Sequence, residues 1–591
     1  MSLDIARSIA FSGLSAAQVQ ISVASSNISN ADTTGYTEKT ANQESTVTAG
    51  VGTGVVVTGI SSTVDKLLLK SLVNSTSDLG SADTTNTYLT ELEQLYGSST
   101  SSSSTTTGTS LANTLASFES ALSSLSATPS STSLQSNAVS ALDDVTSQLR
   151  ETSSGIQNLR ANADQDISTS VDSINKDLQQ ISDLNSEIKQ ESASGQSTAD
   201  LEDQRNTALQ DVASKMNVSY YTASNGDLQV YTTSGQALVD SSAHTLSYTA
   251  AANVTASTTY SAGSTSGFSG ITVNGVDITS QITSGKIGGL ITLRDQTLPA
   301  AQTQLDQLAQ QLTSSLNAVS NQGTSVPPPT SLTGTATVSS STALSATGTV
   351  RLAVTDQSGN LVSYQDLDLS SYSTVGDLVT AINGISGMSA SVDSSGHLKI
   401  SATGSGDGVA INEMTSSVGS SDEGFSDYFG LNDLVTGTSA SNIAVRSDIL
   451  SGSAALPTST LDSSSTLTTG NSVLSSGSAT VVNALSSAMT ASTSFSAAGG
   501  LSATTSSFAD YAAAIVSNVA SKASQASSTY SVKETAQSTY ASSLSSESGV
   551  NLDEETSRLS SLQNEYSAAT ELIQVINSMF SSLITAVQTV S

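Results

Sequence analysis

The chain has 591 residues, of which 36% are hydrophobic, and a formal net charge of −32. Such an acidic chain lacks the basic face that binding to nucleic acid or to an anionic membrane surface requires, so we expect neither partner. It contains no cysteine, which excludes disulfides, thiolate nucleophiles and cysteine-based metal sites.

The length predicts roughly three to five domains. The first 20 residues lack a basic segment followed by an apolar one, so we expect no standard secretory signal peptide. No stretch reaches the roughly 18 consecutive apolar residues that span a membrane. These features predict a soluble chain that, if it is exported, leaves the cell by another route.

The N-terminal run predicts an amphipathic helix with two apolar faces. One set of apolar residues alternates spacings of four and three, as in a coiled-coil seam, and a second set runs beside it. The first set is Ala10, Leu14, Ala17, Ile21, Ala24 and Ile28, and the second is Ile5, Ile9, Ala16, Val19 and Val23.

A turn-rich segment follows directly, "SSNISNADTTGYTEK" at residues 25–39. Asn, Asp and Gly tolerate tight or left-handed backbone, and short polar side chains can satisfy freed amides locally. We expect Gly35 to adopt a conformation closed to larger residues and Tyr36 to anchor the turn by packing. The alternative is an ordinary loop at the end of a helix.

The middle of the chain reads as helices around a β-rich insert. Near-heptad spacing predicts one long helix over 142–190 and a shorter one over about 198–216. Alternating strands flank Asn225-Gly226 within 218–233, a strong hairpin signal. Another helix is expected over about 295–322, which leaves about 218–293 as the insert.

"SVPPPTS" at 325–331 interrupts this pattern. From there to about 440 we expect β-structure with one helix. Residues 455–500 are rich in Ser and Gly and are expected to be partly irregular, and a helix near 505–545 leads to the C-terminus.

The C-terminal run carries the strongest pattern. Its apolar residues keep an unbroken alternation of three and four, and "NLDEE" at 551–555 suits a helix start, with Asn551 as the cap and acidic residues at the positive end of the helix dipole. The seam consists of Leu559, Leu562, Tyr566, Ala569, Ile573, Ile576, Phe580, Leu583, Val587 and Val590.

Catalytic chemistry has little support in this sequence. The two histidines, His244 and His397, lie far apart, and we interpret both as surface or structural residues. Paired acids such as Asp143-Asp144 do not face each other on a helix. "GSGDG" at 404–408 lacks the residues of a phosphate or calcium loop. We therefore predict no enzyme activity, no catalytic or metal site and no cofactor.

Both ends of the chain resemble a known family. "ISVASSNISNADTTGYTEKTA" resembles the N-terminal signature of bacterial flagellar rod, hook and hook-associated proteins, in which an Asn-rich turn ends in Thr-Pro-Gly-Tyr. Asn27, Asn30, Thr33, Gly35 and Tyr36 match it, while Thr34 stands where proline is usual. "SGVNLDEETSRLSSLQNEYSAATELIQVINSMFSSLITAV" resembles the matching C-terminal signature.

The middle is similar to the hook-associated proteins in particular, through "YLTELEQLYG", "DLEDQRNTALQDVASKMNVSYY" and "SGKIGGLITLRDQTLPAAQTQLDQLAQQL". This resemblance covers roughly 1–325 and 420–591. The part at about 340–412 resembles the small β-rich insert of flagellins and related axial proteins.

The resemblance implies a structural adaptor that joins hook to filament by self-assembly. In this family terminal helices of many subunits form a coiled-coil tube around an export channel, and the middle domains point outward. It implies hook protein below, a second junction protein above, an export chaperone, and export by the flagellar type III apparatus. The protein would lie outside the cell, after a cytoplasmic phase.

The expected fold is multidomain α+β, with long terminal coiled-coil helices, a helical-bundle middle and β-rich outer domains. The expected domains are 1–60 (helix and turn), 61–217 with 294–325 (helical), 218–293 and 326–440 (β-rich), 441–545 (return segment) and 546–591 (C-terminal helix).

The expected assembly residues at the N-terminus are Ile5, Ile9, Leu14, Ile21, Asn27, Ile28, Asn30, Gly35 and Tyr36. At the C-terminus, where the chaperone would also bind, they are Leu559, Leu562, Tyr566, Ile573, Ile576, Phe580, Leu583 and Val587.

Three alternatives remain open. The chain could be another axial protein of the hook or distal rod, a surface adhesin, or an enzyme carried on an axial scaffold. The lattice, the role of 340–412 and glycosylation do not follow from the sequence.

Overall fold

The computed structural model describes residues 3–48, 50–97, 110–264 and 267–590, without the side chain of residue 590. The chain forms two compact units. The first comprises Met1–Tyr88, Ala161–Asp295 and Ser524–Ser591, and the second comprises Leu89–Arg160 and Gln296–Ala523. The expected multidomain α+β class with long terminal helices is confirmed, whereas the six expected domain boundaries stay predictions.

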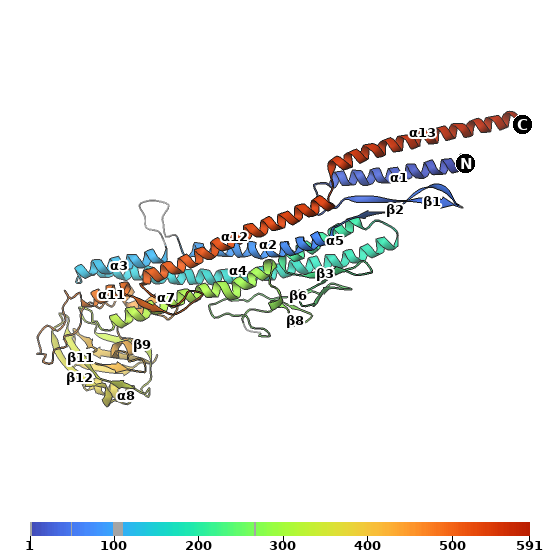
Figure 1. The fold of residues 1–591 in the computed structure, drawn as a ribbon. Coiled ribbons are helices and arrows are strands. Elements are labelled where there is room, and N and C mark those ends of the chain that lie inside the picture. Colours follow the sequence, from blue (N-terminus) through green and yellow to red (C-terminus); the bar gives the residue numbers. More distant parts are fainter. Residues whose placement is uncertain (1–2, 49, 98–109, 265–266, 591) are drawn as a thin grey trace. The chain divides into compact units, whose positions relative to one another are not determined.

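The first unit contains both ends of the chain. Helix α1 (Leu3–Asn30) lies beside helix α13 (Leu552–Val590), and the two pack along each other (Figure 1). Asn551 caps α13 as expected, because its Oδ1 accepts the backbone N–H groups of Asp553 and Glu554 at 3.1 and 3.4 Å.

A β-hairpin follows α1, which corrects the expectation of only a helix and a turn over 1–60. Strands β1 (Lys39–Thr48) and β2 (Val51–Ser62) pair antiparallel, with register shifts at Asn42/Gln43 and Thr46/Val47. The hairpin lies close against α1, since a Cβ on Gly54 would stand 2.1 Å from Ser12 Oγ. The bulges and the Gly-rich β2 break the two-residue alternation that marks a strand in sequence.

The expected turn at 25–39 is shorter than predicted. Residues 25–30 form the last turns of α1, and β1 begins at Lys39. The segment between them, residues 31–38, is called the signature turn below.

Long helices continue the first unit. Helix α5 (Ala199–Lys215) belongs to it, while α2 (Lys66–Leu95), α4 (Thr132–Ala193) and α12 (Phe508–Ser548) include residues of both units. The helix expected over 142–190 lies inside α4. Every residue of its apolar seam is buried, which explains the near-heptad spacing: Leu142, Val145, Leu149, Ile156, Leu159, Ile167, Val171, Ile174, Leu178, Ile181 and Ile188.

The insert contains the expected hairpin. Strands β3 (Ser219–Thr222), β4 (Leu228–Tyr231) and β5 (Ala237–Val239) form one sheet, and β6 (Leu246–Ser247), β7 (Thr272–Val273) and β8 (Val276–Asp277) form another. The turn between β3 and β4 contains Asn225 and Gly226, the latter at φ +86°. The insert ends earlier than predicted, because α6 (Gly285–Thr292) is already helical. A π-helical turn (Leu293–Thr297) joins α6 to α7 (Leu298–Ser320).

The second unit carries the expected β-rich region. Strands β12 (Leu361–Asp368), β11 (Thr349–Asp356) and β15 (Asp407–Asn412) form one three-stranded sheet, and β13 (Met388–Val392), β14 (His397–Ala402) and β9 (Ser331–Thr337) form another. Helix α8 (Val375–Asn383) packs against β13 and begins with a capping box between Thr374 and Asp377. The sequence predicted one helix in this region, and the structure adds a second, short one at Phe425–Phe429.

The rest of the second unit consists of short elements and two further helices. Helices α3 (Leu111–Ala127) and α11 (Thr480–Thr490) pack together, and α11 lies in the segment 455–500 that was expected to be partly irregular. The short elements are β10 (Ala346–Thr347), β16 (Ser417–Val418), α9 (Phe425–Phe429), β17 (Val435–Thr436), β18 (Ala444–Val445), α10 (Ser447–Leu450), β19 (Thr493–Phe495) and β20 (Thr504–Ser506).

Within the described residues, one helical stretch, Phe508–Thr589, is long and apolar enough by length and composition to cross a membrane. Polar residues interrupt this stretch, so it is apolar on average and not as an unbroken run. The predicted absence of a membrane partner stays a prediction.

Candidate functional site

The signature turn is fixed by the side chain of Asn27, which is fully buried near the end of α1. Its Nδ2 donates to Lys39 O at 2.9 Å, and its Oδ1 accepts Lys39 N–H at 3.0 Å. Because these two bonds satisfy both backbone groups of Lys39, the start of β1 is tied to the end of α1.

Tyr36 and Asn30 complete the turn. The Tyr36 hydroxyl donates to Asn27 Oδ1 at 3.0 Å, and Thr33 N–H donates to Asn30 O at 2.9 Å. Gly35 has φ +82°, a left-handed conformation that favours glycine. A Cβ at Gly35 would also stand 2.7 Å from Thr207 Oγ1 of α5, so the turn approaches that helix too closely for a side chain.

A buried ion pair anchors the turn to α5. Lys39 Nζ contacts Asp203 Oδ2, and their side chains are 5% and 9% exposed. The Asp203 carboxylate also accepts Thr37 N–H at 3.0 Å and Thr37 Oγ1–H at 2.7 Å. The Lys39 ammonium lies 4.3 Å from the centre of the Tyr36 ring, within cation–π range. Burial, and then the charges of Asp200, Asp203 and Glu555, raise the pKa of Tyr36, so its hydroxyl stays a donor.

The turn is joined to the C-terminal segment as well. Glu38 N–H donates to Ser548 O at 2.8 Å, at the end of α12. Arg558 of α13 places Nη1 3.7 Å from Glu38 Oε1 and 3.3 Å from Glu555 Oε1. Glu555 lies in the first turn of α13, as the sequence predicted, but its side chain is buried, with 1% exposed. The structure thus brings both ends of the chain together at one point.

The predicted seam residues divide into two groups. Buried Leu562 and Ile576 and half-buried Leu559, Ile573 and Phe580 lie on the partly covered side of α13. Tyr566, Leu583 and Val587 are exposed. On α1 the five predicted aliphatic residues, Ile5, Ile9, Leu14, Ile21 and Ile28, are half-buried, while the tightest contacts use Ala10, Ala16, Ala17, Val23 and Ala24.

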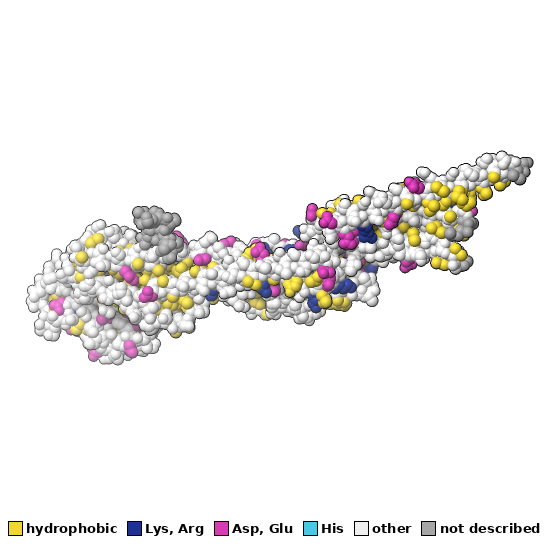
Figure 2. Space-filling model, turned by 45° about the horizontal axis from the view of Figure 1, so that its top comes forward, with side chains coloured by type: hydrophobic (Ala, Val, Ile, Leu, Met, Phe, Trp, Pro, Cys, Tyr) yellow, Lys and Arg dark blue, Asp and Glu magenta, His cyan; other side chains and the backbone are white. Residues whose placement is uncertain are grey.

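Much of the terminal surface is apolar. Figure 2 shows hydrophobic side chains on the surface of the terminal helices. On α13 these side chains are 50–65% exposed, more than single scattered residues would account for. They are Leu572, Val575, Met579, Leu583, Ile584 and Val587, and Phe11 of α1 is 66% exposed.

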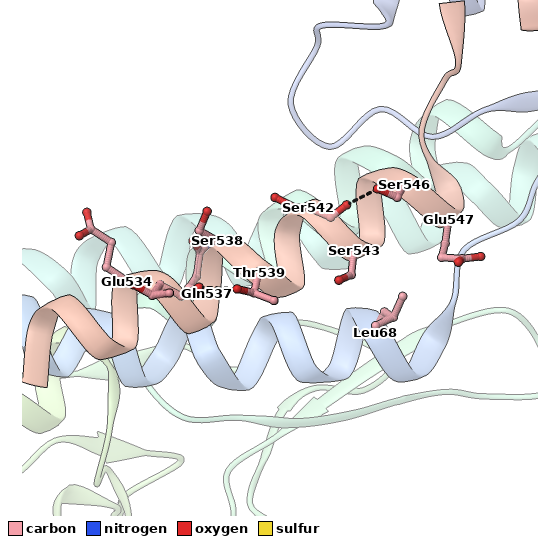
Figure 3. A pocket seen from close by; sticks show the side chains of 10 residues that line it. Leu68, Glu534, Gln537, Ser538, Thr539, Ser542, Ser543, Ser546 and Glu547 are labelled. Atoms are coloured by element: carbon pink, nitrogen blue, oxygen red, sulfur yellow. Dashed lines mark hydrogen bonds between the residues drawn. The ribbon is translucent and has the colours of Figure 1, made fainter.

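Two hollows lie near the signature turn. A cavity of about 620 Å³ is bounded by residues 31–37, the start of α2, the middle of α5 and the end of α12. A groove of about 1030 Å³ runs along α12 beside Leu68 of α2 (Figure 3). Ser, Thr and Gln side chains dominate the groove, and Ser546 Oγ donates back to Ser542 O at 2.9 Å. A groove of this composition suits packing contacts better than acid–base chemistry.

Each of the two histidines has an aspartate four residues earlier as its neighbour. His244 Nε2 is 3.1 Å from Asp240 Oδ2, and His397 Nδ1 is 3.9 Å from Asp393 Oδ2. Across the parts of the chain that the structure describes, no three His, Asp or Glu side chains are grouped so as to hold a metal ion.

Comparisons with known proteins agree with this arrangement. A family model described as "Flagellar hook-associated protein FlgK helical domain" matches residues 89–331. "Flagella basal body rod protein" matches residues 8–37, which include most of α1 and most of the signature turn, and "Flagellar basal body rod FlgEFG protein C-terminal" matches 541–586. These matches support a hook-associated protein of the flagellum.

Relatives in this family are distant. The chain is 25% identical over 322 residues to flagellar hook-associated protein 1 of Salmonella typhimurium, covering 53% of this chain and 56% of that one. It is 25% identical over 309 residues to the Escherichia coli protein of the same name, covering 51% and 54%. The chain thus spans about half the length of the curated relatives it matches.

One solved structure also matches this chain. The flagellar hook junction protein FlgK from Burkholderia pseudomallei is 18% identical, with a TM-score of 0.46, and the match covers 80% of this chain and 98% of that chain. The family model "Flagellin hook IN motif" matches residues 349–404, which confirms the expected likeness of the outer β-rich region to flagellins.

The turn follows from the sequence, but the residues on other elements that hold it in place do not. Asn27, Asn30, Gly35 and Tyr36 lie together as predicted, whereas Asp203 was not singled out. The sequence does contain both partners of this ion pair, the lysine of "TEKTA" and an aspartate of "LEDQRN". They lie far apart along the chain, however, and no local pattern indicates that they meet.

Proposed function

We propose that the protein is a structural adaptor that joins hook to filament in the bacterial flagellum and assembles through its N- and C-terminal helices. The observation that carries the proposal is the exposed apolar stripe of α13. Val587 is 65% exposed and Leu583 is 54% exposed in the single chain. Near the start of the same helix, Arg558 Nη1 lies 3.7 Å from Glu38 Oε1.

Large apolar residues on a seam of coiled-coil spacing are stable when another helix covers them. One side of α13 is already covered by α1. Further copies of the same pair of helices would cover the other side, and repetition of one such contact between successive copies generates a ring or a helical array. The family relationship makes the flagellum, outside the cell, the place of this assembly.

The remaining partners follow from the family resemblance. Hook protein would lie below and a second junction protein above. Before export, α13 would lie in the groove of an export chaperone, with its apolar face as the anchor. The flagellar type III apparatus would then export the chain. We assign no catalytic role, because the relatives are structural proteins of the flagellum.

An exposed residue of α13 allows a direct test of assembly through this helix. Val587→Ser should abolish incorporation at the hook tip while leaving the thermal stability of the subunit unchanged, because Val587 touches little within one copy. Val532→Ser is the matched control, since Val532 is 66% exposed on α12, away from the terminal helices. We expect the control to assemble normally. Incorporation of Val587→Ser at the wild-type level would contradict the proposal.

A second variant tests whether α13 is also the segment that binds the chaperone. Ile576 is 4% exposed within one copy. Ile576→Asp should therefore weaken the packing of α1 on α13 as well as hook incorporation, and it should lower chaperone affinity measured by calorimetry. Unchanged chaperone affinity would remove α13 as the binding segment without affecting its role in assembly.

The alternatives are less well supported. A hook or distal-rod protein does not account for the match of the hook-associated helical domain over 89–331. An adhesin or an enzyme on an axial scaffold would need a binding or catalytic site, and the outer β-rich region matches a flagellin motif instead.

A further inference from the structure

A buried carboxylate at the base of α13 has an unsatisfied oxygen. The Glu555 side chain is 1% exposed, and its Oε1 lies 3.3 Å from Arg558 Nη1. Its other oxygen, Oε2, has no hydrogen-bond partner among the described residues. A buried acceptor without a donor is unfavourable, and more so when it is charged.

A second carboxyl lies near the same arginine. Glu38 Oε1 lies 3.7 Å from Arg558 Nη1, so both acids are neighbours of one guanidinium nitrogen. The position of Glu38 is fixed by its backbone, which donates to Ser548 O at 2.8 Å. Glu38 Oε1 and Glu555 Oε1 lie 3.7 and 3.3 Å from Arg558 Nη1, which places the two glutamate side chains close to each other.

An ionised Glu38 cannot help Glu555, because a carboxylate only accepts hydrogen bonds. A protonated Glu38 can, because its O–H is a donor. We propose that Glu38 binds a proton and donates it to Oε2 of Glu555, so that the attachment of α13 to the signature turn depends on pH.

The surrounding charges favour the proton. Burial, and then the negative charges of Glu555 and Glu554, raise the pKa of Glu38, while Arg558 acts in the opposite direction. On the α5 side, Asp203 pairs with Lys39, and the more exposed Asp200 lies 3.6 Å from the same ammonium. The Tyr36 hydroxyl, a donor to Asn27, adds no positive charge.

The direction of the pH effect follows from linkage. Because the attached state binds the proton more tightly than the detached state, the added stability is fully present below the ordinary pKa of a glutamic acid. It is lost as the pH rises through the raised pKa of Glu38. The attachment therefore weakens toward neutral and alkaline pH. For one proton, the equilibrium changes by at most about tenfold per pH unit.

Glu38→Gln tests the proposal, because a glutamine amide donates to Glu555 at every pH. Hydrogen exchange of α13 amides at 552–562 would be measured in the full-length purified protein from pH 5 to 8 and corrected for intrinsic rates. We expect wild-type protection to fall by several-fold as the pH rises and Glu38→Gln to keep the low-pH level throughout. Glu44→Gln, at an exposed position of the adjoining strand β1, should follow the wild type.

Glu555→Gln is a second variant, since its amide can donate to an ionised Glu38 and should also flatten the profile. Parallel pH profiles of wild type and Glu38→Gln would overturn the proposal, as would lower protection in Glu38→Gln at every pH. The inference goes beyond the proposed function and needs no assembly, so its failure would leave the role at the hook–filament junction untouched.

Discussion

At the scale of single residues, Asn27 forms with its side chain the two hydrogen bonds that a neighbouring strand would form with its backbone. It can do so because the amide offers a donor and an acceptor side by side, which match the N–H and C=O of Lys39. An aspartate in this place would present only acceptors, and an alanine would leave both backbone groups of Lys39 buried and unpaired. The residue type is thus set by the geometry at the start of β1.

The ion pair of Lys39 and Asp203 gives the first prediction at this scale. Asp203→Ala should destabilise the protein by about 3–5 kcal/mol, because it leaves a buried ammonium and the Thr37 donors without their acceptor. Urea unfolding followed by circular dichroism would measure the change.

Asp200→Ala is the matched control on the same helix. Its carboxylate is also near Lys39, at 3.6 Å, but its side chain is 71% exposed, so we expect less than about 1 kcal/mol. Equal losses for the two variants would show that the buried pair has no special role in holding the turn.

At the scale of elements, the start of the outer β-rich region is held by a cluster of acids around α9. Asn321, which follows α7, donates from Nδ2 to Asp433 Oδ1 at 2.7 Å and to Asp427 Oδ1 at 3.3 Å. Burial, and then the charges of Asp433, Glu423 and Glu413, raise the pKa of Asp427 to about 6. The neutral acid is the form that the folded protein favours.

We therefore expect the stability of the folded protein to depend on pH through Asp427. Its contribution is present below the ordinary pKa of aspartic acid and is lost as the pH rises through about 6. Asp427→Asn keeps a neutral side chain that can still accept from Asn321. Its melting temperature relative to the wild type should rise between pH 5 and 7.5, as measured by calorimetry.

Asp422→Asn, an exposed aspartate in the preceding turn, is the control and should show no such change. A constant difference between Asp427→Asn and the wild type over this pH range would mean that Asp427 is ionised throughout.

Some helices and strands could be predicted from the sequence, and others could not. The seams of α1, α4 and α13 are long and periodic, so their helices follow from spacing alone. The β1–β2 hairpin does not, because its bulges and glycines break the alternation of a strand. It is stabilised by close contact with α1, where Val55 N–H donates to Ser12 Oγ at 3.1 Å. Contacts of that kind join residues that no local pattern relates.

The candidate site divides in the same way. Gly35 and Tyr36 were predictable because a left-handed turn and a buried anchor have residue preferences. Asp203, Glu555 and Arg558 were not, because each acts on a partner far away in the sequence. Glu555 even carries a misleading signal, since an acid in the first turn of a helix is usually explained by the helix dipole.

At the scale of the whole molecule, the distribution of charge supports assembly through the ends. The chain has a net charge of −32, yet residues 8–31, 45–64 and 572–591 contain no Asp, Glu, Lys or Arg. The described residues of these stretches lie mainly in α1, the hairpin and the end of α13. Copies of an acidic protein repel each other, and a contact surface without acids is where that repulsion is weakest. The terminal region combines low charge with exposed apolar side chains, as a surface for self-association requires.

The central claim is that the protein joins hook to filament through its terminal helices. The most direct test is a strain that lacks the protein, with its flagella imaged by electron microscopy and secreted flagellin measured in the medium. The account predicts complete hooks without filaments and flagellin lost to the medium, both restored by the wild-type gene. Absent or shortened hooks would place the protein lower on the axis, and normal filaments in a strain without a second copy of the gene would contradict the account.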